Sequence, residues 1–232
     1  MNLFLIPGFM TDKKLWQEME PALSALGNIV YGDISLGKNL REIALHNIAM
    51  SPDRFVLVGF SLGGYVARWI ASLVPERIEA LVLIATSNFP DSDNQKAIKF
   101  RTAEIVKNGF FDGLSLTTIR TSLHVNNKNN QYLIELIRAM SLRLGPDVFI
   151  NQLKLQRDNP TYLSSPRNYP VLIIASACDE LRTLVEAQSL QREFPKSTLR
   201  IIENAGHMLP LEQPINLVKT ISTWLEESTN TS

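Results

Sequence analysis

The chain has 232 residues, 45% of them hydrophobic, so it is long enough to bury one large core within a single domain. Lysine plus arginine equals aspartate plus glutamate at 23 each, which provides no overall basic field to favour nucleic acid. A single cysteine, Cys178, excludes an intrachain disulfide and fits a reducing compartment. The N-terminal "MNLFLIPG" lacks the basic region of a signal peptide, and no apolar run reaches the roughly 18–20 residues of a membrane span. These features predict a cytoplasmic globular domain without a membrane span.

Apolar runs alternate along the chain with segments of helical spacing. Most of the runs are dense in Val, Ile and Leu without clean alternation, which is typical of a parallel sheet covered on both faces. The expected strands are Asn2–Ile6, Asn28–Gly32, Arg54–Gly59, Ala80–Ala85, Pro170–Ala175 and Thr198–Ile202. The expected helices between and after them are Lys13–Leu26, Leu40–Met50, Leu62–Val74, Leu184–Glu193 and Pro214–Glu227. This order predicts an α/β fold with a parallel sheet and right-handed crossovers.

A long interval separates the fourth and fifth expected strands. About eighty residues pass without a convincing strand, which is unusual for a compact domain unless the connection is functional or a subdomain. Helical spacing is found at Gln95–Lys107, Tyr132–Leu144 and Pro146–Arg157. We therefore predict a helical cap at residues 88–169, inserted into a core formed by residues 1–87 and 170–232.

The segment "VLVGFSLGGYVARWIA" at residues 56–71 contains the sharpest expected bend. Gly59-Phe60-Ser61-Leu62-Gly63 follows an expected strand and opens an expected helix, the context that distinguishes a nucleophile elbow from a bare G-x-S-x-G pattern. A positive φ at the turn brings the flanking chain close, so only small residues fit at Gly59 and Gly63. The bend predicts an exposed Ser61 hydroxyl near a helix N-terminus, whereas the simpler interpretation is a serine that only caps the helix.

A serine nucleophile needs a base, and the sequence offers three histidines. His46 lies within a helical segment, and His124 lies in the insertion without a supporting motif. His207, in "ENAGHMLPLEQP", directly follows the sixth expected strand. Because open α/β sheets place their sites at the carboxyl ends of the strands, His207 is the predicted base.

The acid that orients the base is expected after the fifth strand, in "VLIIASACDEL". Asp179 lies there, between nucleophile and base in chain order, and Glu180 is its neighbour and rival. Asp33 and Asp91 also follow strands but lie at less suitable ends. We predict Asp179, and we interpret Cys178 as a packing residue because no elbow surrounds it.

Acyl transfer also needs donors for a developing oxyanion. The backbone N–H of Leu62, directly after the nucleophile, is the first expected donor. The second is expected from the loop after the first strand, "LIPGFMTD", where Gly8 permits a turn. The Phe9 N–H is the predicted donor, with Met10 as the alternative.

These segments together resemble the α/β-hydrolase superfamily, and within it the small bacterial serine esterases and lactonases with a helical cap. The resemblance extends from "LIPGFMTDKKLW" through "GFSLGG" and "SACDE" to "AGHMLPLEQP", and so covers nearly the whole core. Family members often have His-Gly where this chain has Pro7-Gly8. By the resemblance, the first expected strand corresponds to the family's third, so we expect no counterpart of the usual N-terminal antiparallel pair. The resemblance implies six parallel strands in the order 2-1-3-4-5-6.

We predict a serine hydrolase of carboxylic esters that forms an acyl-enzyme on Ser61 and needs no metal or cofactor. The alternatives are a thioesterase, lactonase or acyltransferase with the same triad, or a hydrolase-like binding protein without turnover. The expected partner is a small ester. An acidic acyl-carrier protein is a further candidate, because residues 88–169 contain 11 Lys and Arg against 7 Asp and Glu. That excess suggests a basic rim at the pocket mouth, made of Lys96, Lys99, Arg101 and Arg138; the alternative is an ordinary solvated surface.

Overall fold

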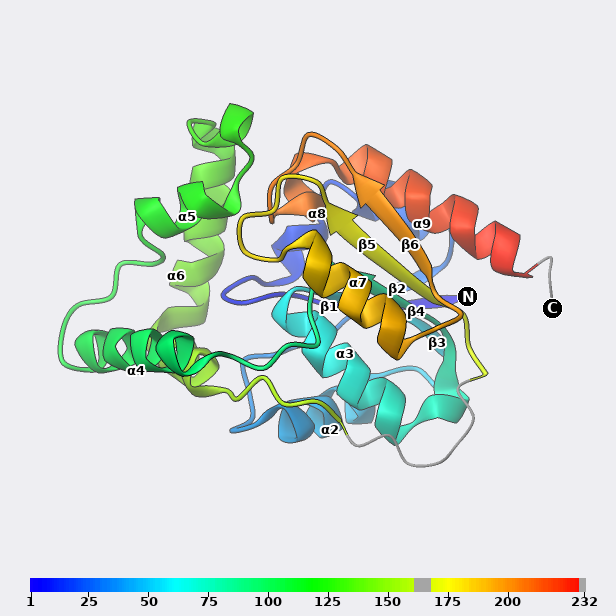
Figure 1. Cartoon of the computed structure of the whole chain (residues 1–232), viewed down its shortest axis with the longest axis horizontal. Helices are drawn as coiled ribbons and strands as arrows, with labels where there is room; N and C mark the ends of the chain where they lie inside the picture. Colours follow the sequence, from blue (N-terminus) through cyan, green and yellow to red (C-terminus); the bar gives the residue numbers. More distant parts are fainter. Residues whose placement is uncertain (161–167, 230–232) are drawn as a thin grey trace.

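A computed structural model describes residues 1–160 and 168–229 and contains one six-stranded sheet (Figure 1). The strand order is β2-β1-β3-β4-β5-β6 and every neighbouring pair is parallel, so the predicted fold class and strand order are confirmed. The strands are β1 (Asn2–Ile6), β2 (Asn28–Tyr31), β3 (Phe55–Phe60), β4 (Ile78–Ile84), β5 (Val171–Ser176) and β6 (Thr198–Ile202).

Alternate side chains of the central strands enter separate hydrophobic cores on the two faces of the sheet. In β1, Leu3 and Leu5 belong to one core, whereas Phe4 and Ile6 belong to the other. Helices α2 (Leu40–Met50), α3 (Leu62–Leu73) and α7 (Leu184–Glu193) cover the second face, and α1 (Glu20–Ser24) and α9 (Pro214–Thr229) cover the first. Burial on both faces explains why the strands are apolar throughout rather than alternating.

The predicted helix Lys13–Leu26 is wrong as a continuous element. The chain instead forms a short 3-10 helix, η1 (Lys13–Trp16), and then α1, with Pro21 in the first turn of α1. Proline has no N–H to donate to the preceding turn, so it starts a helix more readily than it continues one. The other core elements match their predicted positions to within a residue or two.

The interval between β4 and β5 is helical, with α4 (Asp93–Lys107), α5 (Leu116–Ser122), the 3-10 turn η3 (Val125–Asn127) and α6 (Gln131–Lys154). The α6 segment bends at Gly145, where φ is 78°, so it corresponds to the two helices predicted around Pro146. Helix α5 was not predicted from the sequence. The three helices lie together beyond the arrowheads of the strands (Figure 1). The division into core and cap remains a prediction, and residues 161–167 of that predicted cap lie outside the described residues.

One short helix lies between the sixth strand and α9. Helix α8 (Leu209–Glu212) directly precedes α9 and follows the loop after β6. Across residues 1–160 and 168–229, no helix has both the length and the apolarity needed to cross a bilayer.

Candidate active site

Ser61 lies at the turn between β3 and α3 with φ 51° and ψ −114°, a conformation that non-glycine residues rarely adopt. A Cβ atom on Gly59 would lie 2.6 Å from the Gly63 carbonyl oxygen, and one on Gly63 would lie 2.3 Å from the Pro7 carbonyl oxygen. Both contacts are too short for real atoms, so the turn requires glycine at these positions. The sequence therefore encodes the bend through sterics, as the spacing predicted.

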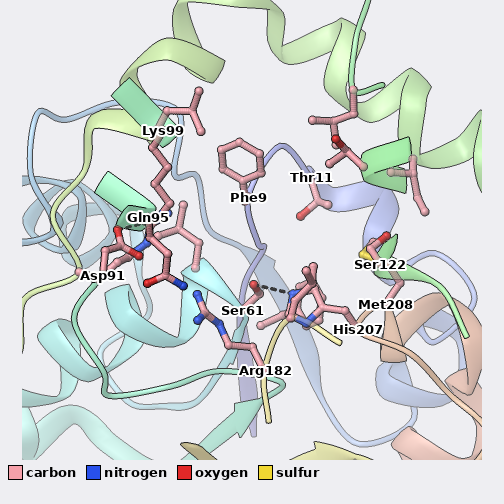
Figure 2. A pocket seen from close by; sticks show the side chains of 18 residues that line it. Phe9, Thr11, Ser61, Asp91, Gln95, Lys99, Ser122, Arg182, His207 and Met208 are labelled. Atoms are coloured by element: carbon pink, nitrogen blue, oxygen red, sulfur yellow. Dashed lines mark hydrogen bonds and ion pairs between the residues drawn. The ribbon is translucent and has the colours of Figure 1, made fainter. Parts of the chain in front are cut away.

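The structure brings Ser61, His207 and Asp179 into one hydrogen-bonded chain. The His207 Nε2 atom lies 2.8 Å from Ser61 Oγ, and Nδ1 lies 2.8 Å from Asp179 Oδ2. Figure 2 shows the first of these contacts at the floor of a pocket. Each residue follows a different strand, β3, β5 or β6, so parallel strand order alone collects them at one edge of the sheet.

Both oxygens of the Asp179 carboxylate have hydrogen-bond partners. Its side chain is fully buried, and Oδ1 accepts hydrogen bonds from the Leu181 and Arg182 N–H groups at 2.7 and 2.9 Å. Oδ2 is therefore directed at the imidazole. The rival carboxylate, Glu180, pairs with Lys128 Nζ at 2.9 Å, and the carboxylate that contacts His207 is that of Asp179.

The remaining candidates lie in other environments. His46 is exposed on α2 and Asp33 accepts a hydrogen bond from the Ser35 N–H. His124 is buried, and its Nδ1 accepts a hydrogen bond from the Asn126 N–H. The interpretation of Cys178 as a packing residue is wrong, because this cysteine is exposed in the turn after β5.

The loop that presents His207 is attached to the end of α5. The N–H groups of His207 and Met208 both donate to the Ser122 carbonyl oxygen, at 2.9 and 3.2 Å. The Glu212 carboxylate joins the same two segments, since it accepts hydrogen bonds from the N–H groups of Gly206 and His124, each at 2.7 Å. The position of the histidine thus depends on a segment inserted between β4 and β5.

The loop after β1 forms a compact turn next to Ser61. Thr11 closes it, because the Gly8 N–H donates to Thr11 Oγ1 at 2.8 Å. The Met10 N–H donates to the buried Gln152 side chain at 2.9 Å, whereas the Phe9 N–H meets no acceptor among the described residues. The Leu62 N–H likewise has no acceptor in the described part of the chain. Of the two predicted alternatives, Phe9 is the one with a free donor.

Gln152 was not predicted, and no pattern in the sequence distinguishes it from other helical glutamines. Its side chain accepts from the Met10 N–H and donates to the Ile34 carbonyl oxygen at 3.1 Å, so α6 connects the loops after β1 and β2.

We expect Gln152→Leu to destabilise the protein by about 1–3 kcal/mol and to lower kcat, because it leaves buried backbone groups unpaired and loosens the turn. Urea unfolding and steady-state kinetics measure the two effects. Gln156→Leu, at an exposed position four residues later, is the matched control. Unchanged stability and kcat in Gln152→Leu would contradict this role.

A cavity of about 270 Å³ opens above Ser61 and His207. Its apolar wall comes from both the strand-end loops and the inserted helices, and includes Phe9, Phe60, Leu62, Leu114, Ile137, Leu153, Leu181 and Met208.

The predicted basic rim is wrong, because only Lys99 of its four residues lines the cavity. Lys96 pairs with Asp93 and Arg138 with Asp112 on the surface, and helical periodicity carries Arg101 away from the opening. Arg157 and Arg182 also line the cavity and were not predicted.

Comparison with protein families gives one decisive match. The model described as the alpha/beta hydrolase fold matches residues 49–214, which include the elbow, Asp179 and His207. The chain belongs to the α/β hydrolase fold family. Within the described residues of this α/β hydrolase, no group of three or more His, Cys, Asp or Glu side chains is arranged to hold a metal ion.

Relatives of this α/β hydrolase include named esterases. It is 26% identical to the biotin biosynthesis bifunctional protein of Teredinibacter turnerae over 97% of this chain, but it spans only 44% of that relative's length. It is 27% identical to the pimeloyl-[acyl-carrier protein] methyl ester esterase of Pectobacterium atrosepticum, over 92% of this chain and 89% of that protein. A thermophilic esterase from Thermogutta terrifontis, solved with malate bound, superposes with a TM-score of 0.82 at 26% identity, over 98% and 90% of the two chains.

Proposed function

We propose that this α/β hydrolase is a carboxylic ester hydrolase that works through an acyl-enzyme on Ser61. The observation that carries the proposal is the chain of two 2.8 Å contacts from Asp179 through His207 to Ser61 Oγ at the floor of the cavity. The esterase names of the full-length relatives agree with this assignment.

The first half of the reaction transfers the acyl group to the protein. His207 Nε2 takes the proton of Ser61 Oγ as that oxygen attacks the ester carbonyl, and Asp179 holds the proton on Nδ1 and so keeps Nε2 available as a base. The Phe9 and Leu62 N–H groups have no other acceptor among the described residues and stabilise the oxyanion. Collapse of the intermediate releases the alcohol, which takes its proton from the imidazolium.

The second half uses water in place of the serine. His207 removes a proton from the water as it attacks the acyl-enzyme, and the same two N–H groups hold the second oxyanion. Release of the acid restores the Ser61 hydroxyl. This chemistry is completed by residues of this chain and uses no cofactor.

A second candidate substrate is an ester carried by an acyl-carrier protein. The relatives named as pimeloyl-[acyl-carrier protein] methyl ester esterases align over most of this chain, at 27% and 24% identity, and favour it. A thioesterase, lactonase or acyltransferase would use the same residues and differ only in the leaving group or acceptor.

Labelling with a fluorophosphonate probe tests the proposal, because the probe reacts with an activated serine and not with an inert one. We expect labelling of Ser61, identified by peptide mass spectrometry, and turnover of short p-nitrophenyl esters. An unlabelled serine in folded protein would favour a binding protein without turnover and overturn the proposal. A matched set of ester, thioester, lactone and carrier-protein substrates then separates the remaining candidates.

A further inference from the structure

One side of the cavity contains a group of charged side chains that the proposed mechanism does not use. Figure 2 shows Asp91, Gln95 and Lys99 on one side of Ser61, with His207 and Met208 on the other. Arg182, close to Ser61 in the same view, and Arg157 also line the cavity. The group comes from four separate segments: the loop after β4, helix α4, the segment after α6 and the loop after β5.

The charges of this group do not balance. Lys99 Nζ pairs with Asp91 Oδ2 at 2.5 Å, and Arg182 Nη1 pairs with Glu186 Oε1 at 3.1 Å. Arg157 has no carboxylate of its own among the described residues. Three cations therefore face two carboxylates, which leaves one positive charge without a counterion.

Arg157 is the member whose environment points to a missing ligand. It is only 5% exposed, and its Nε and Nη1 atoms are buried without a hydrogen-bond acceptor in the described structure. Its guanidinium carbon lies 5.9 Å from the centre of the Tyr65 ring, and that of Arg182 lies 5.8 Å from the same centre. The aromatic ring positions both guanidinium groups but accepts no proper hydrogen bond from them. A buried guanidinium without a hydrogen-bond acceptor is costly, so its unpaired atoms call for a partner such as a bound ion, a water molecule or a ligand group.

The acid–base properties of the group agree with an excess of positive charge. Burial, followed by repulsion from Arg157, lowers the pKa of Lys99 from 10.5 to about 8 despite its contact with Asp91. Burial also lowers the pKa of Arg157 to about 10, with Asp91 opposing the shift and Arg182 adding to it. A bound anion would oppose both shifts.

We propose that Arg157, together with Lys99 and Arg182, binds a free carboxylate of the substrate, so that this hydrolase prefers half-esters of short dicarboxylic acids. The planar guanidinium fork matches a carboxylate in two parallel hydrogen bonds. The cavity has a volume of about 270 Å³ and must also hold the scissile ester. The carbon chain between that ester and the free carboxylate is therefore short. The inference rests on the proposed function, because it supplies the second end of a substrate whose first end is cleaved at Ser61.

The test compares monomethyl glutarate with its neutral isostere, methyl glutaramate, in the wild-type protein and in Arg157→Gln. We expect the wild type to favour the half-ester, and Arg157→Gln to lower kcat/KM for it by about 10- to 100-fold, mainly through KM. For the neutral isostere, kcat/KM should change by less than about 3-fold in the same variant. Arg157→Lys should restore part of the preference, because it returns the charge without the fork. Arg138 is an exposed arginine on α6 outside the cavity, so Arg138→Gln is the matched control. It should leave kcat/KM unchanged for both substrates.

Binding of glutarate without turnover separates this inference from the proposed function. We expect calorimetry to show glutarate binding to Ser61→Ala protein and loss of that binding when Arg157→Gln is added. If no ester is hydrolysed but glutarate still binds through Arg157, the proposed reaction fails and the carboxylate site stands. Equal activity of the wild type on the two esters, equal losses for both in Arg157→Gln, or binding of inorganic phosphate in place of glutarate would overturn the carboxylate site.

Discussion

Replacement of Ser61 by alanine is expected to lower kcat for ester hydrolysis by a factor on the order of 10⁴–10⁶ while the protein remains folded. The variant removes only Oγ, which has its hydrogen bond to His207 and lies in the cavity. The backbone strain at φ 51° is common to serine and alanine, because both carry a Cβ atom. Stopped-flow or steady-state assays with a p-nitrophenyl ester measure the loss, and circular dichroism with thermal unfolding verifies the fold.

A serine on α3, the helix that follows Ser61, provides the matched control. Ser72 is also buried on α3, but its hydroxyl donates to the Trp69 carbonyl oxygen at 2.8 Å and lines no part of the cavity. Ser72→Ala should therefore keep near-wild-type kcat. Hydrolysis by Ser61→Ala at a rate close to that of the wild type would contradict the proposed mechanism.

Replacement of Asp179 by asparagine is expected to lower kcat by a factor on the order of 10⁴. Oδ1 accepts two backbone N–H groups, so the amide oxygen of asparagine takes that place and its NH₂ faces His207 Nδ1. Nδ1 must then accept a hydrogen bond, which moves the imidazole proton to Nε2 and leaves no base for Ser61. Steady-state kinetics give the loss, and fluorophosphonate labelling should slow in parallel.

Glu180→Gln is the control for this variant, because Glu180 is the adjacent carboxylate and pairs with Lys128 at the surface. Exposed ion pairs of this kind contribute little, so both activity and stability should stay close to wild type. If Glu180→Gln loses activity and Asp179→Asn does not, the assignment of the acid is wrong by one residue.

The confirmed strand order and the approach of the three predicted triad residues to one another depend on local sterics and parallel topology. Ser61 is identified by glycines that the turn demands, and Asp179 and His207 by their positions just after strands that end at one edge of the sheet. These constraints act within a few residues or follow from parallel topology. A single sequence therefore contains enough information to predict these features.

The parts that could not be predicted depend on contacts between distant segments. Gln152 reaches the turn at Met10 across the fold, and Arg157 lines the cavity from the segment after α6. The helical period of α4 places Lys96 and Lys99 on one face of the helix. Only the packed structure shows that, of these two lysines, Lys99 lines the cavity and Lys96 does not. Pro21 is the exception, because its missing N–H was a visible signal against one continuous helix from Lys13 to Leu26.

The attachment of the His207 loop to Ser122 bears on how chimaeras with relatives of this family could be built. The carbonyl oxygen of Ser122 accepts two N–H groups of that loop, and Gly206 packs so closely on the same segment that a Cβ atom would lie 2.5 Å from the His124 nitrogen. An exchange of residues 88–169 for a foreign segment would thus replace part of the support of the proposed general base, His207, as well as part of the pocket wall. Grafts that retain residues 122–124 of this chain should preserve turnover while altering substrate choice, and grafts that replace them should lose both together.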